Sequence, residues 1–292
     1  MTSENGVSRT ANTSAKSELR NTWEKAAPGW AKWEREFSAG LLSATDTLID
    51  MAGIRAGMRV LDLACGAGSQ TIDAARRAGP SGSVVACDIS ATMLDHVRQN
   101  ATAAGLQNVE TLECAAEELD KTLPPFDAAI SRLGLMLFLS PSSALKTTQC
   151  VLKPGARFAA LVFTTPDKNP FMAQPMAILL RCAGKSPPKP GQPGIFALGE
   201  SGILERLMRD SGLAHVQTKY VTASLNLPNA SHALEMMQEA FGGYRAVVAD
   251  LSDAEKSKAW NEVYTCLKQF DGVGGFAAQF EFIIGVGSKA SK

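Results

Sequence analysis

The sequence VLDLACGAGSQT, residues 60–71, decides the fold. An apolar run ends in Asp62, and two glycines, Gly66 and Gly68, follow before polar residues that can begin a helix. A strand, a glycine turn and a helix in this order occur where the backbone comes close to a nucleotide-like ligand. The stretch therefore predicts a ligand-binding turn and leaves the ligand open: a dinucleotide, a phosphate, or something else.

Strands and helices alternate beyond this turn. Strands are expected at residues 59–63, 84–88, 109–113, 127–131 and 157–164, and helices at 70–78, 91–104 and 141–152. The early strands are nearly continuous apolar runs, typical of parallel strands covered on both faces. The repeated order of strand, crossover and strand predicts an α/β fold, with a doubly wound, mostly parallel sheet and right-handed crossovers.

The rest of the chain divides around this core. The expected segments are a polar, disordered leader (1–17), an N-terminal helical lid (18–53), the ligand-binding core (54–165), a loop, helix and strand that complete it (166–228), a helical cap insertion (229–275), and the last strand and tail (276–292). The lid places aromatic residues on one helical face, with a break expected near Pro28–Gly29. In the cap, Ser252 and Glu255 form a capping box that begins a helix.

Composition excludes several classes of protein. Lysine plus arginine number 29 and aspartate plus glutamate number 29, so the chain lacks the basic excess of a general nucleic-acid binder. None of the six cysteines forms a CxxC pair, so no metal site is expected. The cysteines are expected to be free thiols in a reducing compartment. No apolar run is long enough to span a membrane, and no signal peptide is visible. A cytoplasmic protein is expected, with its oligomeric state open.

The turn itself discriminates between the three ligands. A phosphate-binding P-loop needs four residues between its glycines and then Lys-Ser/Thr, and nothing here fits. A dinucleotide turn reads GxGxxG or GxGxxA, but Thr71 stands at the third position, where tight packing beside a pyrophosphate is needed. S-Adenosylmethionine carries a zwitterionic amino-acid end and no phosphate, so it needs a close backbone and a carboxylate. Asp62, Gly66 and Gly68 offer both.

The segment DLACGAG resembles motif I of the class I S-adenosylmethionine-dependent methyltransferases, in the form found in the ubiquinone/menaquinone-biosynthesis-type small-molecule enzymes. The resemblance covers residues 53–165 and, more loosely, the chain to Ser288. Ala64 stands where many members have a third glycine. The resemblance implies a seven-stranded Rossmann-like methyltransferase fold with a helical cap. The last strand, FEFIIGVGSK, is then antiparallel and inserted beside the fifth.

The same resemblance implies the cofactor contacts. Asp88, about 20 residues past the turn, is expected to accept hydrogen bonds from a ribose, which suits NAD as well as S-adenosylmethionine. Glu117 is either an adenine contact or a solvated acid at a helix start, and Met93 either packs beneath the adenine or belongs to the helix core. The full set of expected cofactor residues is Asp62, Ala64, Gly66, Ala67, Gly68, Asp88, Ile89, Met93, Ala115, Ala116, Glu117 and Ser131.

Substrate and catalytic residues follow from place and composition. Arg132 ends the fourth strand, the position that faces the reactive methyl group in this fold. Apolar, adaptable side chains of the lid and cap suit a flat or greasy acceptor. The expected substrate residues are Trp30, Trp33, Arg132, Met136, Phe171, Met237, Phe241 and Tyr244. No catalytic base is assigned, although His232 at the start of the cap and Asp167 after the fifth strand are candidates.

The sequence predicts methyl transfer from S-adenosylmethionine to a small, largely apolar molecule by in-line displacement under the cap. Oxygen or carbon is favoured as the acceptor and nitrogen stays open, because the Asn-Pro-Pro-Tyr motif of base- and amide-directed enzymes is absent. Two alternatives remain. One is a cofactor-binding protein without methyl transfer, either regulatory or using the sulfonium charge for another reaction. The other is an NAD-dependent oxidoreductase, although no Tyr-x-x-x-Lys is present.

Overall fold

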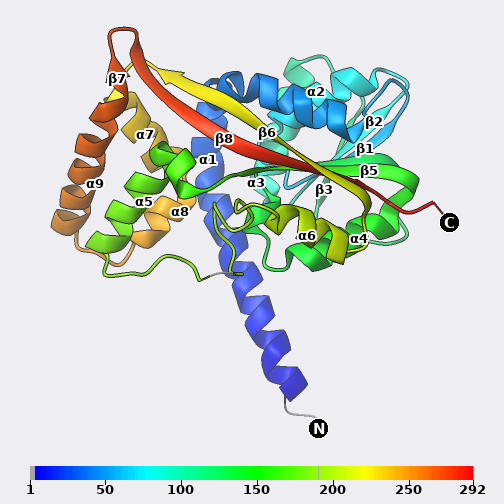
Figure 1. Cartoon of the computed structure of the whole chain (residues 1–292), viewed down its shortest axis with the longest axis horizontal. Coiled ribbons are helices and arrows are strands. Elements are labelled where there is room, and N and C mark those ends of the chain that lie inside the picture. The colour runs from blue at the N-terminus through cyan, green and yellow to red at the C-terminus, as the bar shows by residue number, and fades with distance from the viewer. Residues whose placement is uncertain (1–3, 190, 292) are drawn as a thin grey trace.

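The computed structural model describes residues 4–189 and 191–291, with side chains from Ser14 onward. A single sheet runs through it in the order β3-β2-β1-β4-β5-β8-β6 (Figure 1). The strands are β1 (Arg59–Leu63), β2 (Ser83–Asp88), β3 (Val109–Glu113), β4 (Phe126–Arg132), β5 (Leu152–Phe163), β6 (Ala214–Leu227) and β8 (Gly275–Ser288), and a short β7 (Asp271–Gly272) pairs with β8. The first five are parallel, whereas β8 is antiparallel to both β5 and β6. The predicted insertion of an antiparallel last strand beside the fifth is confirmed.

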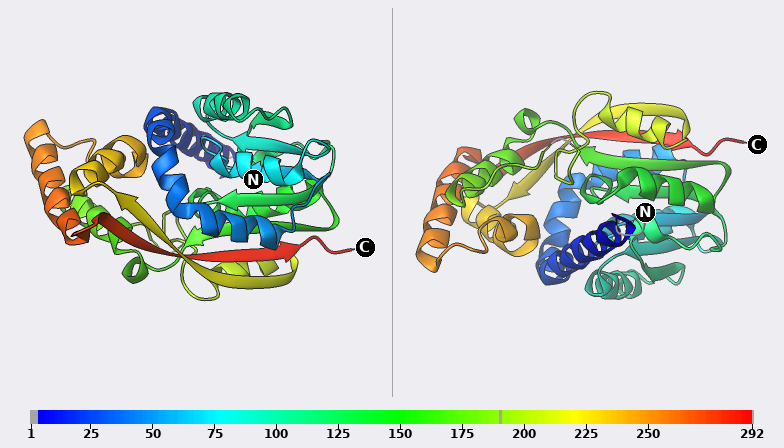
Figure 2. Two further views of the ribbon diagram at one scale, coloured as in Figure 1. Left: turned by 90° about the horizontal axis from the view of Figure 1, so that it is seen from above. Right: turned by 90° about the horizontal axis from the view of Figure 1, so that it is seen from below.

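Helices divide into two groups. Those of the core are α2 (Ser69–Ala78), α3 (Ala91–Ala103), α4 (Pro141–Val151) and α6 (Ile203–Asp210). Those of the cap are α5 (Pro170–Cys182), α7 (Ala230–Ala240), α8 (Gly242–Val247) and α9 (Asp253–Leu267). Single turns of 3₁₀ helix lie at Ala116–Glu118, Leu135–Leu137, Pro166–Lys168 and Lys268–Phe270. Seen from above and below, the cap helices lie at one end of the sheet (Figure 2).

The cap is attached through the sheet. β6 and β8 are each 14 residues long, so they extend past the core strands and carry the paired ribbon into the cap. There Phe276 and Phe280 of β8 pack edge-on against Phe171 of α5. Helix α5 packs in turn on α9. The segment expected to complete the core therefore supplies one helix to the cap. The predicted capping box of Ser252 and Glu255 is present at the start of α9.

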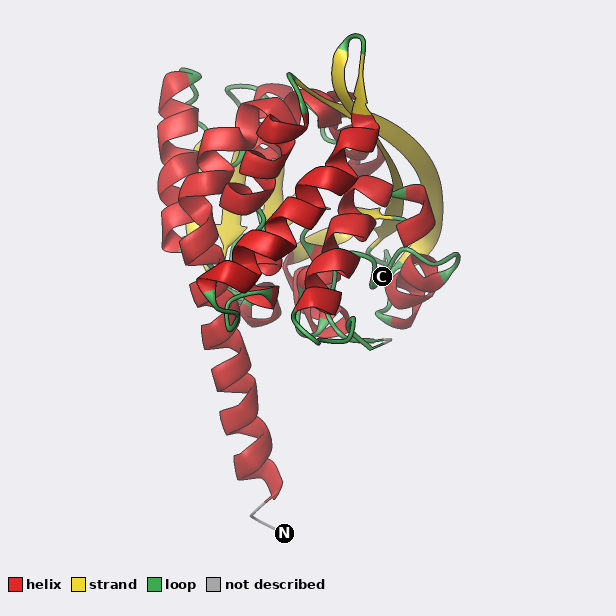
Figure 3. Cartoon of the chain, turned by 90° about the vertical axis from the view of Figure 1, so that its left-hand side faces the viewer, coloured by secondary structure: helices red, strands yellow, loops and turns green. Residues whose placement is uncertain are grey.

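One long helix, α1 (Glu4–Ala52), runs between the cap and the core, and its first turns project from the body (Figures 1 and 3). Two predictions about this segment are wrong. From Glu4 onward the expected leader is helical, because a formed helix adds residues at its end at little cost; residues 1–3 lie outside the described chain. The helix also passes through Pro28 without a break.

Close packing against the cap accounts for the unbroken helix. Pro28 is exposed, whereas Gly29 beside it is buried against α7, so closely that a Cβ there would lie 1.9 Å from the Glu239 carbonyl oxygen. Ala26 and Ala27 are fully buried on the same turn. This buried surface compensates for the hydrogen bond that proline removes. Gly53 follows the last helical residue with a left-handed φ of +73°, as is common where a helix ends.

Among the described residues, no helix has both the length and the apolar character needed to cross a membrane.

Candidate cofactor and acceptor site

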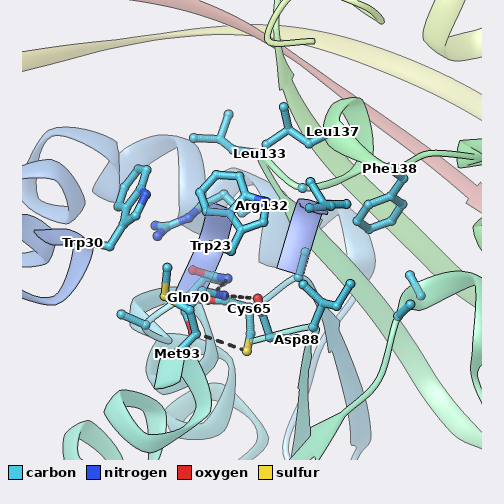
Figure 4. A pocket seen from close by; sticks show the side chains of 18 of the residues that line it. Trp23, Trp30, Cys65, Gln70, Asp88, Met93, Arg132, Leu133, Leu137 and Phe138 are labelled. Carbon is cyan, nitrogen blue, oxygen red and sulfur yellow. Dashed lines mark hydrogen bonds between the residues drawn. The ribbon is translucent and has the colours of Figure 1, made fainter. Parts of the chain in front are cut away.

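A cavity lies at the carboxyl ends of β1, β2 and β4, under the inner face of α1 (Figure 4). This edge of a doubly wound sheet is where such folds bind ligands. The lining residues come from α1 (Lys16, Leu19, Trp23, Trp30, Glu34, Phe37, Ser38), the glycine turn (Ala64, Cys65, Gly66, Ala67, Gln70), the end of β2 (Asp88, Ile89, Met93), the segment after β3 (Cys114, Ala115, Ala116, Glu117) and the segment after β4 (Arg132, Leu133, Gly134, Leu137, Phe138, Leu139).

Asp62 lies beneath the glycine turn and does not reach the cavity. Its carboxylate is fully buried and accepts hydrogen bonds from Thr71 Oγ1 at 2.6 Å and Gln70 Nε2 at 3.4 Å. Gln70 Nε2 also donates to the Cys65 carbonyl at 2.8 Å. Burial raises the pKa of Asp62 to about 7. Asp62 therefore connects the turn to the start of α2. One of its two hydrogen-bond donors is Thr71, the residue that does not fit a dinucleotide-binding turn.

The two glycines of the turn do different things. Gly66 lines the cavity with φ +56°, and a Cβ there would meet no atom within 4 Å. Gly68, with φ +95°, does not line the cavity, and its Cβ would lie 2.9 Å from Val97 Cγ2 on α3. Gly66 thus leaves room on the ligand side, and Gly68 lets α3 approach the turn.

Ala64 lines the cavity with an unusual backbone. Its φ of +54° lies in the left-handed region, and so does the φ of +61° at Leu133, which follows β4. Many relatives were expected to carry a glycine at position 64, and this conformation explains that preference. The segment after β4 packs closely against Ala64 at Gly134, since a Cβ at Gly134 would lie 2.5 Å from the Cβ of Ala64.

Asp88 is placed where β2 ends and its carboxylate faces the cavity. Its Oδ2 accepts a hydrogen bond from the Gly66 amide and its Oδ1 one from the Ser90 amide, both at 2.9 Å. Burial raises the pKa of Asp88 despite these bonds. Each oxygen keeps lone-pair capacity for a further donor. Asp88 therefore fixes the glycine turn and still presents acceptors to a ligand.

The other expected adenosine residues also line the cavity. They are Ile89, Met93, Ala115, Ala116 and Glu117. Glu117 accepts a hydrogen bond from the Ser140 amide at 3.1 Å, so it connects the segment after β3 to the start of α4. Ser131 lies outside the lining, buried beside Gly134, and its hydroxyl has no partner among the residues that the structure describes.

Glu34 of α1 is a lining residue that the sequence analysis did not identify. Its Oε1 accepts a hydrogen bond from the Ser69 amide, the first residue of α2, at 2.7 Å, and its Oε2 accepts one from Asn100 Nδ2 at 2.8 Å. Burial raises the pKa of Glu34, with the Ser69 bond and Arg132 acting against it. The signal was its spacing, four residues after Trp30 and three before Phe37, which places it on the aromatic face.

Arg132 lies beside Glu34 and also lines the cavity. Its guanidinium donates to Thr45 Oγ1 at 3.0 Å and to the Ser69 hydroxyl. Burial lowers the pKa of Arg132, and the nearby acids Asp62, Glu34 and Asp73 act against that shift. Arg132 thus lies at the cavity, and its role toward a substrate stays a prediction.

Apart from Trp30 and Arg132, the expected substrate residues support the cavity rather than line it. Trp33 donates from Nε1 to Glu239 Oε2 at 2.6 Å, and Tyr244 donates from its hydroxyl to the Met172 carbonyl at 2.7 Å. Phe241 packs on Trp30 with ring centroids 5.6 Å apart. Met136, Phe171 and Met237 are buried in the hydrophobic core. These side chains hold the cap against α1.

The two candidate bases lie away from the cavity. His232 is exposed in the first turn of α7, where its amide donates to the Asn229 side chain at 3.1 Å. Asp167 is exposed in the 3₁₀ turn after β5. Neither residue lines the cavity.

Comparisons with known proteins agree with this architecture. Residues 43–180 match the model of the ubiE/COQ5 methyltransferase family. Among curated proteins, the chain is 39% identical over 127 residues to the ubiquinone/menaquinone biosynthesis C-methyltransferase UbiE of Hahella chejuensis, covering 43% of this chain and 51% of that protein. It is 37% identical over 122 residues to UbiE of Pseudomonas aeruginosa, covering 41% and 48%. The chain thus spans about half the length of the curated relatives that it matches.

Solved structures extend the likeness to the whole fold. The YcgJ protein of Bacillus subtilis covers 86% of this chain and 99% of its own, with a TM-score of 0.56 and 18% identity. The 4+2 cyclase SpnF covers 86% and 82%, with a TM-score of 0.53 and 17% identity. The chain carries the Rossmann-like fold of the class I S-adenosylmethionine-dependent methyltransferases, and its residues 43–180 are similar to the ubiE/COQ5 methyltransferase family.

Proposed function

We propose that this protein transfers a methyl group from S-adenosylmethionine to a small, largely apolar molecule, with oxygen or carbon favoured as the acceptor atom. The likeness of residues 43–180 to the ubiE/COQ5 family supports the reaction class. The residues that line the cavity support the kind of cofactor.

The observation that carries the proposal is the carboxylate of Glu34 at the amino end of α2. In dinucleotide-binding folds this helix end binds the pyrophosphate through free amides and the helix dipole. Here the Ser69 amide already donates to Glu34 at 2.7 Å. A second anion at the same place would meet like charge, whereas the ammonium of S-adenosylmethionine would be attracted. The cavity therefore favours a cationic nucleoside over NAD.

The lining residues fit such a nucleoside from end to end. Asp88 offers carboxylate oxygens to a ribose diol, and Ile89 and Met93 offer apolar surface to the adenine beside Ala115 and Ala116. Trp30 Nε1 and the Ser38 hydroxyl are buried without a partner in the part of the chain that the structure describes, as expected of groups that meet a ligand. A separate part of the lining, with Trp23, Leu133, Leu137 and Phe138, is apolar and suits the acceptor (Figure 4).

When bound, the sulfonium supplies an electrophilic methyl group, so the protein's own task is positioning. The lining residues, Asp88 and Glu34 among them, would hold the cofactor, which would supply its methyl group to an acceptor atom placed in line behind it. The aromatic face of α1 and the residues after β4 hold the acceptor and exclude water. Orientation of this kind contributes on the order of 7–11 kcal/mol. The roles of His232 and Asp167 as bases lose support from their exposed positions.

Calorimetry tests the cofactor. We expect S-adenosylmethionine and S-adenosylhomocysteine to bind and NAD not to bind; binding of NAD alone would overturn the proposal. Release of S-adenosylhomocysteine from the cofactor, measured with a library of phenols, quinols and acidic carbon compounds, then tests transfer and identifies the acceptor. Absence of turnover with every acceptor, in the presence of tight cofactor binding, would favour the alternative below.

Asp88 gives a residue-level test. Asp88→Ala removes the ribose acceptors together with the contact to the Gly66 amide, so we expect S-adenosylhomocysteine to bind at least tenfold more weakly. That loss corresponds to about 1.4 kcal/mol or more, the range of a hydrogen bond to a charged group. Unchanged affinity in a titration would remove Asp88 from the site.

A cofactor-binding protein that does not methylate is the second candidate. The fold also occurs in SpnF, which its name describes as a 4+2 cyclase.

A cytoplasmic location, expected from the pattern of cysteines, stays a prediction.

A further inference from the structure

Three polar side chains line the cavity along one stripe of α1. Trp30, Glu34 and Ser38 are four residues apart in succession, so they lie on the same face of the helix. We call these three residues the α1 stripe. They supply, in order, an N–H donor, a carboxylate and a hydroxyl group.

Two members of the stripe have no hydrogen-bond partner among the described residues. Trp30 Nε1 and Ser38 Oγ are both buried, and neither is paired within that part of the chain. A buried indole N–H can only donate, so its natural partner is an oxygen. Because each unsatisfied buried group costs free energy, such a pair facing a cavity indicates the oxygens of a ligand.

The third member has spare capacity and an excess of negative charge around it. Each carboxylate oxygen of Glu34 accepts one hydrogen bond, from Ser69 and from Asn100, and can accept another. Burial lowers the pKa of the neighbouring Arg132, and the nearby carboxyl groups of Asp62, Glu34 and Asp73 act against that shift. Because three acids lie near one cation, a further cation at Glu34 would be stabilised.

We propose that the α1 stripe binds the amino-acid end of the cofactor, with Glu34 accepting from its ammonium and Trp30 and Ser38 donating to its carboxylate. The inference rests on the proposed function. It replaces Asp62 as the expected carboxylate for the amino-acid end, because the Asp62 oxygens accept hydrogen bonds from Thr71 and Gln70 inside the turn. It also gives the protein a determinant of specificity: the same Glu34 carboxylate that takes the ammonium occupies the place of a pyrophosphate.

Two ligands separate this role from a structural one. S-Adenosylhomocysteine carries the amino-acid end, whereas 5′-methylthioadenosine has the same adenosine and thioether without it. In titrations of the full chain, we expect Glu34→Gln to weaken S-adenosylhomocysteine at least tenfold and to change 5′-methylthioadenosine less than twofold. Trp30→Phe, which keeps the aromatic surface and removes the N–H, should weaken S-adenosylhomocysteine at least threefold with the same selectivity.

Glu36→Gln is the matched control, since Glu36 is exposed on the same helix and does not line the cavity. It should leave both affinities unchanged. Binding of 5′-methylthioadenosine to each variant also reports that the site has folded, and Trp30→Phe carries the test if Glu34→Gln does not fold.

Equal weakening of both ligands, or no weakening of S-adenosylhomocysteine by either variant, would overturn the inference. Failure of the wild-type protein to bind either ligand would instead overturn the proposed function.

Discussion

At the residue scale, the buried acidic groups in and around the cavity determine how the free energy of unfolding depends on pH. Asp62 has a pKa of about 7 in the folded protein because it is buried. Burial also raises the pKa values of Glu34, Asp73 and Asp88. In the unfolded chain such groups ionise near pH 4. Between these values the folded protein holds protons that the unfolded chain has lost.

We therefore expect the free energy of unfolding to fall as pH rises from about 4 to about 7, by up to about 1.4 kcal/mol per pH unit for each such proton. Asp62→Asn removes one titrating group, so its profile should be less steep over this range. Urea unfolding at pH 4.5, 5.5, 6.5 and 7.5 measures both slopes. Parallel profiles for the two proteins would show that Asp62 ionises normally.

Ala64 offers a second test, because its left-handed φ of +54° is unfavourable for a residue with a Cβ. Ala64→Gly should raise the free energy of unfolding by about 1 kcal/mol, the relief of strain outweighing the entropy that glycine adds to the unfolded chain. Ala104→Gly is the control, since Ala104 has a φ of −81° and should gain nothing. Denaturant midpoints compare the two; a loss of stability in Ala64→Gly would contradict the argument.

At the scale of elements, α1 shows how packing overrides a local signal. Pro28 and Gly29 are each unfavourable inside a helix, by about 3 and 1 kcal/mol relative to alanine. The helix continues through both because Gly29 lets its backbone approach the Glu239 carbonyl of α7. The same device recurs at Gly40, where a Cβ would lie 2.7 Å from the Ser224 carbonyl oxygen of β6.

Gly29→Ala tests this directly. Helix propensity alone predicts a gain of about 1 kcal/mol, but the new Cβ would collide with fixed backbone of α7, so we expect a net loss of about 2 kcal/mol or more. Gly243→Ala in α8 is the matched control, because nothing lies within 4 Å of its added Cβ and stability should stay level or rise. Thermal and urea unfolding give both values, and a stabilised Gly29→Ala would show that α1 and α7 are not in close contact.

At the scale of the whole molecule, α1 connects the core to the cap and covers the cavity. Toward the core, Glu34 accepts from the Ser69 amide; toward the cap, Trp33 donates to Glu239, and Lys32 pairs with Glu235 and Glu239 at 2.7 Å. The exposed ion pairs contribute little individually. The buried contacts to a ligand would add to this connection, so occupation of the cavity should stabilise the helix over the core.

Hydrogen exchange measured by mass spectrometry checks this coupling. With S-adenosylhomocysteine bound, we expect slower exchange in residues 14–38 of α1 and in the turn at residues 64–68. Residues 253–267 of α9 do not line the cavity and serve as the internal control. Protection confined to the turn, with α1 unchanged, would show that α1 does not respond to the ligand.

The strands and helices of the core followed closely from local pattern. The predicted bounds of 59–63 and 109–113 coincide with β1 and β3, and the helix at 91–104 differs from α3 by one residue. Apolar runs bounded by turns carry this information within a few residues of chain. The helix at residues 170–182 was not predicted, since Pro170 and Pro175 obscure its pattern and its burial depends on α9.

The sequence by itself determined the doubly wound sheet, the glycine turn and the cavity edge, because strand periodicity, the Gly66–Gly68 turn and the carboxylate at the end of β2 are all local features. Only the tertiary structure decided which side chains face the cavity. In the folded chain Asp62 is buried inside the turn, and Gly68 allows α3 to pack against it. Glu34 of α1 contacts the amino end of α2, 35 residues further along the chain. These outcomes depend on contacts between elements distant in sequence, and no local pattern records such contacts.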